Sequence, residues 1–101
     1  MLKHINDVAE FDAAIKEGKV LVDFFATWCG PCKMLSPVLE QLAEKEPDLL
    51  ILKIDVDEVG ALAARFGVQA IPTLILFKDG NQVYKRMGYQ NMNQLLGFIN
   101  Q

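Results

Sequence analysis

The feature that most constrains this sequence is a strand pattern that leads directly into a pair of cysteines. The run Val20-Leu21-Val22-Asp23-Phe24-Phe25 is apolar at every position but one, which is typical of a strand covered on both faces. Cys29 and Cys32 follow it, and a helical pattern begins after them. We therefore expect Cys29 at or just before a helix N-terminus and Cys32 about one turn inside. Cβ atoms three positions apart on a helix are roughly 5–6 Å apart and a disulfide needs about 3.5–4.5 Å, so a small adjustment closes the bond.

Other roles for this cysteine pair fit the sequence less well. A structural disulfide across so short a loop would remove little entropy from the unfolded chain. A zinc site needs four ligands, and beyond the only two cysteines the chain offers a single histidine, His4. Haem attachment needs a histidine at the position that Lys33 occupies, and an iron–sulfur cluster needs two more cysteines. A reversible dithiol remains, and we expect no metal.

Length and charge narrow the class of protein further. The 101 residues suit one domain, 1–101, and the 51% hydrophobic content is ample for a core. A net charge of −3 without a basic face argues against nucleic-acid binding. No apolar stretch approaches the ~20 residues of a membrane-spanning helix, and no signal peptide is visible at the N-terminus. We therefore expect a cytoplasmic protein that binds no membrane.

Hydrophobic periodicity and turn residues predict the remaining elements. Asp55 or Asp57 is expected to cap the third helix, Asn91 to cap the last one, and Asp79-Gly80 to form a tight hairpin turn. The first half of the chain is predicted to form a short strand in 1–5, a helix after Asn6 or Asp7 that stops by Gly18, the strand 20–25, and a helix from the cysteines to Pro47. The second half is predicted to form a strand in 49–54, a short helix closed by Gly67, the strands 72–77 and 82–87, and a C-terminal helix.

The predicted order is β-α-β-α-β-α-β-β-α, an α/β fold. Strands separated by helices are expected to be parallel crossovers, and the final hairpin adds an antiparallel pair. The result is a central mixed five-stranded sheet flanked by four helices, which lie on both faces.

The chain resembles the thioredoxin family nearly from end to end. The resemblance rests on Trp28-Cys29-Gly30-Pro31-Cys32-Lys33 with the strand before it, on Ala70-Ile71-Pro72-Thr73, and on Phe77-Lys78-Asp79-Gly80 with Gly88. It implies the thioredoxin fold. The Gly-Pro between the cysteines is similar to that of the reducing members rather than to the Gly-His of isomerases. Phe25 stands where many members have a second tryptophan, and Tyr89 stands where a small residue is common.

The helix position and the resemblance together assign roles to four residues. Cys29 is the expected nucleophile, because a helix N-terminus favours the thiolate, an effect for which thioredoxin is a standard example. Cys32 is then the resolving thiol. Asp23 would be a buried carboxyl that takes the Cys32 proton, unless its strand face is uncovered. Lys53 would lie near that carboxyl, although a strand lysine whose ammonium reaches solvent explains it nearly as well.

The resemblance also predicts the surface that contacts the substrate. Ile71-Pro72 would be a cis peptide, which could leave the Ile71 backbone free to pair with an extended substrate. An apolar patch would surround Cys29, formed by Trp28, Gly30, Pro31, Ile71, Pro72 and Gly88. Trp28 in the core and Gly88 as a simple turn glycine are the alternatives.

By resemblance the chain is a monomeric, cofactor-free enzyme that reduces disulfides in target proteins and is itself reduced by a flavin-dependent thioredoxin reductase. A binding or chaperone-like subunit of the same fold, whose dithiol is incidental, is a second hypothesis. Retention of both cysteines and of Asp23 favours the reductase. A dedicated oxidant or isomerase is disfavoured by the Gly-Pro pair.

Overall fold

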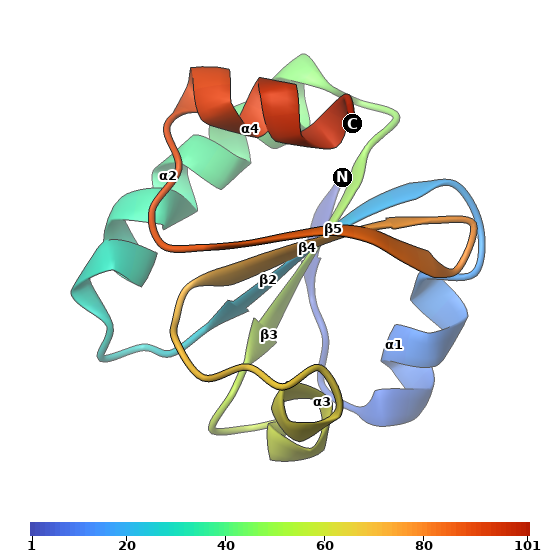
Figure 1. Cartoon of the computed structure of the whole chain (residues 1–101), viewed down its shortest axis with the longest axis vertical. Helices are drawn as coiled ribbons and strands as arrows, with labels where there is room; N and C mark the ends of the chain where they lie inside the picture. The colour runs from blue at the N-terminus through green and yellow to red at the C-terminus, as the bar shows by residue number, and fades with distance from the viewer.

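The computed structural model describes residues 1–101 and has the predicted element order. Figure 1 shows a twisted sheet between two layers of helices, with α2 and α4 on one face and α1 and α3 on the other. The elements are β1 (Leu2–His4), α1 (Val8–Ala14), β2 (Lys19–Phe25), α2 (Gly30–Lys45), β3 (Leu50–Asp55), α3 (Gly60–Arg65), β4 (Thr73–Lys78), β5 (Asn81–Met87) and α4 (Met92–Ile99). None of the helices is both long and apolar enough to span a membrane.

The five strands lie in the order β1-β3-β2-β4-β5, with β2 at the centre. β1 and β2 each pair with β3 in parallel, as predicted, and the hairpin pairs β4 with β5 antiparallel. The expectation of a parallel crossover is wrong for β4, which runs antiparallel to β2. The connection between β3 and β4, residues 56–72, contains only the six-residue helix α3, about 9 Å long, and its remaining residues do not run back along the sheet. The chain therefore stays at the end of the sheet where β3 finishes, and β4 starts from that end.

Local signals account for most of the element ends. The Asp7 side chain accepts from Glu10 N at the start of α1, and Asn91 forms a capping box with Gln94 at the start of α4. Asp79 and Gly80 both have positive φ, as the predicted hairpin turn requires. The predicted cap of α3 is wrong, because the N-cap is Val59 and has no side-chain bond. Asp55 instead accepts from Asp57 N within the preceding turn.

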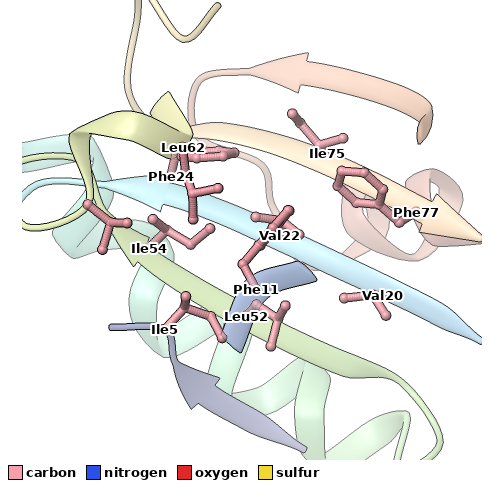
Figure 2. Packing of buried hydrophobic residues seen from close by; sticks show 11 residues of the cluster. Ile5, Phe11, Val20, Val22, Phe24, Leu52, Ile54, Leu62, Ile75 and Phe77 are labelled. Carbon is pink, nitrogen blue, oxygen red and sulfur yellow. The ribbon is translucent and has the colours of Figure 1, made fainter. Parts of the chain in front are cut away.

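Two apolar cores cover the two faces of the sheet. In the first, Val20, Val22 and Phe24 of β2 pack with Phe11 of α1 and Leu62 of α3 (Figure 2). In the second, Leu21 packs with residues of α2 and α4, among them Leu35, Leu39, Leu42, Leu95 and Phe98. Side chains alternate along a strand, so Asp23 lies on the same face as Leu21. The sheet thus directs Asp23 toward α2, the helix that carries the cysteines.

Candidate active site

The two cysteines form a disulfide at the N-terminus of α2. Cys29 is the N-cap residue, and its Sγ accepts a hydrogen bond from Cys32 N at 3.2 Å. Pro31 lies in the first turn, where the missing N–H costs no helical bond. Both expectations, the helix position and the ability of the pair to close, are confirmed. In the dithiol form, the same N–H and the positive end of the helix would stabilise a thiolate at Cys29.

Trp28 lies on the surface rather than in the core. It is 69% exposed, and Gly30 and Pro31 next to the disulfide are exposed too. The indole Nε1 donates to Asp57 Oδ2 at 2.9 Å, which links the cysteine loop to the turn after β3. Apolar surface is therefore present beside Cys29, as predicted.

The Ile71–Pro72 peptide is cis, as predicted, and it lies against the disulfide. Ile71 O is 3.7 Å from Cys29 Sγ. Gly88 has a φ of 90° and donates its N–H to Pro72 O at 2.8 Å, which brings the loop after β5 to the same place. Ile71 and Gly88 are half-buried, whereas Pro72 is buried and supports the surface from below. The six residues predicted for the patch thus gather around Cys29.

Asp23 is a buried carboxyl without a partner. Asp23 is 1% exposed, and neither of its carboxyl oxygens has a hydrogen-bond partner. Burial raises its pKa to about 7, against a smaller opposing effect of the positive charge of Lys53. Its strand face is covered, so the surface alternative is wrong. A carboxyl with such a pKa exchanges protons readily near neutral pH.

Lys53 is the neighbour of Asp23 across the sheet, but its ammonium points elsewhere. The two residues are register partners on β2 and β3. Lys53 Nζ donates to Ser36 Oγ at 2.8 Å and lies 4.7 Å from the centre of the Phe25 ring. Lys53 is buried, so a simple solvent-reaching lysine does not describe it. It lines a cavity of about 240 Å³ beside Cys32, together with Phe25, Ala26, Thr27, Cys32, Lys33 and Ser36.

Reasoning from the sequence missed Ser36 and Asp57. Ser36 is four residues after Cys32, so the helical period already places it on the Cys32 side of α2. Asp57 gave no such signal, because its contact with Trp28 joins two loops far apart in the chain. No group of three or more potential metal-ligating side chains is present at this site or elsewhere in the structure.

A disulfide at a helix N-terminus, with a cis-proline loop against it and a buried acid behind it, defines a class of proteins that exchange disulfides. The comparisons narrow this class. The thioredoxin family model matches residues 3–101. Thioredoxin from Chlamydia pneumoniae is 52% identical over 100 residues, which are 99% of this chain and 97% of the relative. Thioredoxin from Chlamydia muridarum is 54% identical over 89 residues, which are 88% and 87% of the two chains.

Solved structures agree with the sequence relatives. The oxidized form of mitochondrial thioredoxin 3 from Saccharomyces cerevisiae superposes with a TM-score of 0.90 at 40% identity, covering 98% of this chain and 93% of that one. The thioredoxin of Fasciola hepatica gives a TM-score of 0.91 at 36% identity, covering 97% and 96%. The chain belongs to the thioredoxin family and has the thioredoxin fold. It is a thiol–disulfide oxidoreductase that reduces protein disulfides, and no observation favours the binding-subunit alternative.

Proposed function

We propose that Cys29 attacks the target disulfide and that Cys32 resolves the intermediate. The observation that carries this assignment is the position of Cys29 as the N-cap of α2, with the Cys32 N–H directed at its sulfur. Only the Cys29 sulfur receives this stabilisation. Cys29 is also the cysteine whose sulfur faces the Ile71 carbonyl, next to the exposed ring of Trp28.

The exchange moves two electrons from the dithiol to the target. The Cys29 thiolate attacks one target sulfur, so a Cys29–target disulfide forms and the other target sulfur leaves as a thiolate. Cys32 then loses its proton and attacks the Cys29 sulfur. The Cys29–Cys32 bond forms, the bond to the target breaks, and the second target thiolate leaves. Protons from solvent complete both target thiols.

We infer that Asp23 accepts the proton from Cys32 in the second step. Asp23 lies on the face of β2 that α2 covers, and its pKa of about 7 suits proton exchange near neutral pH. The cavity lined by Cys32 has room for water, and Lys53, the strand neighbour of Asp23, lines the same cavity, so we propose that water there carries the proton from Cys32 toward Asp23. The positive charge of Lys53 lowers the pKa of Asp23 and so favours the carboxylate that accepts the proton.

We propose that targets dock on the surface formed by Trp28, Gly30, Pro31, Ile71, Pro72 and Gly88. The Ile71 N–H and C=O make no backbone hydrogen bond, so an extended target segment can pair with them in the manner of an added strand. Pairing there would hold the target sulfur beside Cys29. Trp28 would supply the apolar contact.

The remaining expectations belong to the same proposal. The dithiol must be regenerated after each turnover, for which a flavin-dependent thioredoxin reductase is the expected partner. A protein dithiol can act as a reductant only in a compartment that keeps thiols reduced. The cytoplasm is such a compartment, which supports a cytoplasmic site of action. We further propose that residues 1–101 act as one domain and as a monomer, which sedimentation equilibrium would test.

Trapping the mixed disulfide tests the cysteine roles. Reduced Cys32→Ser protein, mixed with a disulfide target, should accumulate a covalent adduct through Cys29, because no thiol remains to resolve it. Intact-mass and peptide mass spectrometry identify the adduct and its cysteine. The matched control is Cys29→Ser, which should form little adduct. A stable adduct through Cys32 in the control, with none in Cys32→Ser, would reverse the assignment.

A further inference from the structure

The buried acid and the lysine beside it are not paired, which is unusual for two opposite charges in adjacent strands. Asp23 and Lys53 are register partners, yet both oxygens of Asp23 lack hydrogen bonds. The only ion pair in the structure joins Arg65 to Asp12, on the surface. A cation in contact with a buried carboxylate offsets part of the cost of desolvating it, so the separation of the two groups calls for another partner of the ammonium.

Ser36 supplies this contact. Its Oγ accepts from Lys53 Nζ at 2.8 Å, and the ammonium also lies over the ring of Phe25. Both interactions draw the lysine to the side of the cavity that α2 and the end of β2 form. The serine hydroxyl is neutral, so it orients the ammonium without cancelling its charge. Ser36 is one helical turn after Cys32, so the lysine is held next to the thiol that must lose its proton.

The other groups around Asp23 leave Lys53 as its main charged neighbour. The register partner on β4 is the apolar Leu74, and α4 adds only apolar side chains to this core. Besides Lys53, the titratable or charged residues of the surrounding elements are Lys3 and His4 on β1, Lys19 on β2, Asp55 on β3, Lys78 on β4, and Cys32, Lys33, Glu40, Glu44 and Lys45 on α2. Of all these, only the charge of Lys53 contributes to the position of the Asp23 pKa in the disulfide form.

We propose that Ser36 is a positioning residue, which holds the Lys53 ammonium away from the Asp23 carboxyl and so keeps that carboxyl free to take the proton from Cys32. The proposal rests on the proposed role of Asp23. It predicts that loss of the Ser36 hydroxyl releases the lysine. The ammonium then turns to the unpartnered carboxylate, and Asp23 becomes a weaker proton acceptor.

Titration of Asp23 in the disulfide form tests this directly, because no thiol then titrates near it. The carboxyl carbon of Asp23 is followed by NMR across pH 4–9 in the parent, Ser36→Ala and Ser36→Thr proteins. A cation within about 4–6 Å lowers the pKa of an acid by roughly 1–3, so the midpoint in Ser36→Ala should fall by about one pH unit or more. Ser36→Thr keeps the hydroxyl and should titrate like the parent.

The Lys53→Met background shows whether the effect passes through the lysine. Lys53→Met alone should raise the midpoint, and Ser36→Ala should change nothing further in that background. The rate of mixed-disulfide resolution in Ser36→Ala should shift its pH profile in the same direction as the Asp23 midpoint. An unchanged or raised midpoint in Ser36→Ala, or an equal fall without Lys53, would overturn the proposal.

The role of Asp23 itself is tested separately. If Asp23→Asn resolved the mixed disulfide at the parental rate, the proposed proton acceptor would be wrong. The titration would still show whether Ser36 controls the position of Lys53, so the two failures are distinguishable.

Discussion

At the scale of single residues, Asp23 shows how a site can cost stability. A carboxyl that is buried without partners holds its proton more tightly in the folded protein than in the unfolded chain, which is what its pKa of about 7 expresses. An apolar residue would fit these surroundings better, since Leu21 and Leu74, which share this face of the sheet with Asp23, are fully buried. Packing alone therefore does not explain the acid, whereas the proposed proton transfer from Cys32 does.

We expect Asp23→Ala to be more stable than the parent at pH 8. Well below pH 3.8 the carboxyl is protonated in both states, so the parent has no penalty. As pH rises from 3.8 toward about 7, the folded protein alone keeps the proton and loses relative stability, and above pH 7 the loss stays constant. About 1.4 kcal/mol per pH unit sets an upper limit of about 4 kcal/mol, from which the cavity left by alanine subtracts.

Urea titrations of both disulfide-form proteins at pH 4 and pH 8 measure this difference. The advantage of Asp23→Ala should disappear or reverse at pH 4. The variant should also resolve the mixed disulfide more slowly at neutral pH. A stability difference that does not change with pH would mean that Asp23 is not the buried acid described above.

Trp28 is the opposite case, an apolar residue on the surface, for which we proposed a role in target binding. Because it is 69% exposed, Trp28→Ala should change the free energy of unfolding by no more than about 0.5–1 kcal/mol, including its bond to Asp57. It should raise KM for a protein disulfide several-fold. Phe24→Ala is the matched core variant and should lose about 3–5 kcal/mol. A large stability loss in Trp28→Ala, with KM unchanged, would make Trp28 a structural residue.

At the scale of elements, helix ends follow local side-chain chemistry where a cap is present. Asn91 and Gln94 satisfy each other's backbone N–H groups at the start of α4. α3 begins at Gly60 without any side-chain cap, even though three acids, Asp55, Asp57 and Glu58, precede it. The Asp55 carboxylate serves the turn instead, which is a choice that the spacing of the acids does not reveal.

Asn91→Ala should therefore lower the free energy of unfolding by about 1 kcal/mol, because it removes the N-cap of α4. Asn93→Ala is the control in the same helix. Asn93 is exposed and has no capping bond, so its change should lie within about 0.5 kcal/mol of the parent. Thermal and urea unfolding followed by circular dichroism measure both. Equal effects of the two substitutions would show that the cap contributes nothing.

At the scale of the whole molecule, one sheet joins two cores. β2 contributes Val20, Val22 and Phe24 to the core under α1 and α3, and Leu21 to the core under α2 and α4. Because both cores pack on β2, the displacement of β2 from one core would also disrupt its packing in the other. Unfolding should therefore be a single cooperative transition.

Phe11→Ala in one core and Leu39→Ala in the other should each destabilise the whole protein. We expect losses of about 3–5 and 2–5 kcal/mol, since both side chains are fully buried. Far-UV circular dichroism and the fluorescence of Trp28, the only tryptophan, should report the same midpoint in each variant. Separate midpoints for the two signals would show that the two faces unfold independently.

The sequence by itself determined whatever depends on neighbours in the chain. Periodicity and turn residues were sufficient for the order of nine elements, for the cap at Asn91 and for the hairpin at Asp79-Gly80, and they narrowed the first cap to Asn6 or Asp7, of which the structure has Asp7. The spacing of Cys29 and Cys32, with the strand before them and the helix after, was sufficient for a dithiol that closes. These features rest on bonds and contacts within a few residues, which a local pattern encodes.

The tertiary structure alone decided which groups meet across the sheet. That α2 covers Asp23, that Lys53 turns to Ser36, and that Trp28 bonds to Asp57 all depend on elements far apart in the chain. Alternation along β2 and β3 shows which side chains share a face but not what covers that face. The antiparallel direction of β4 has the same origin, because it depends on the pairing of β4 with β2, two strands that are far apart in the chain. Burial and orientation are properties of the assembled layers, so only the fold decided that Asp23 is covered and without a partner.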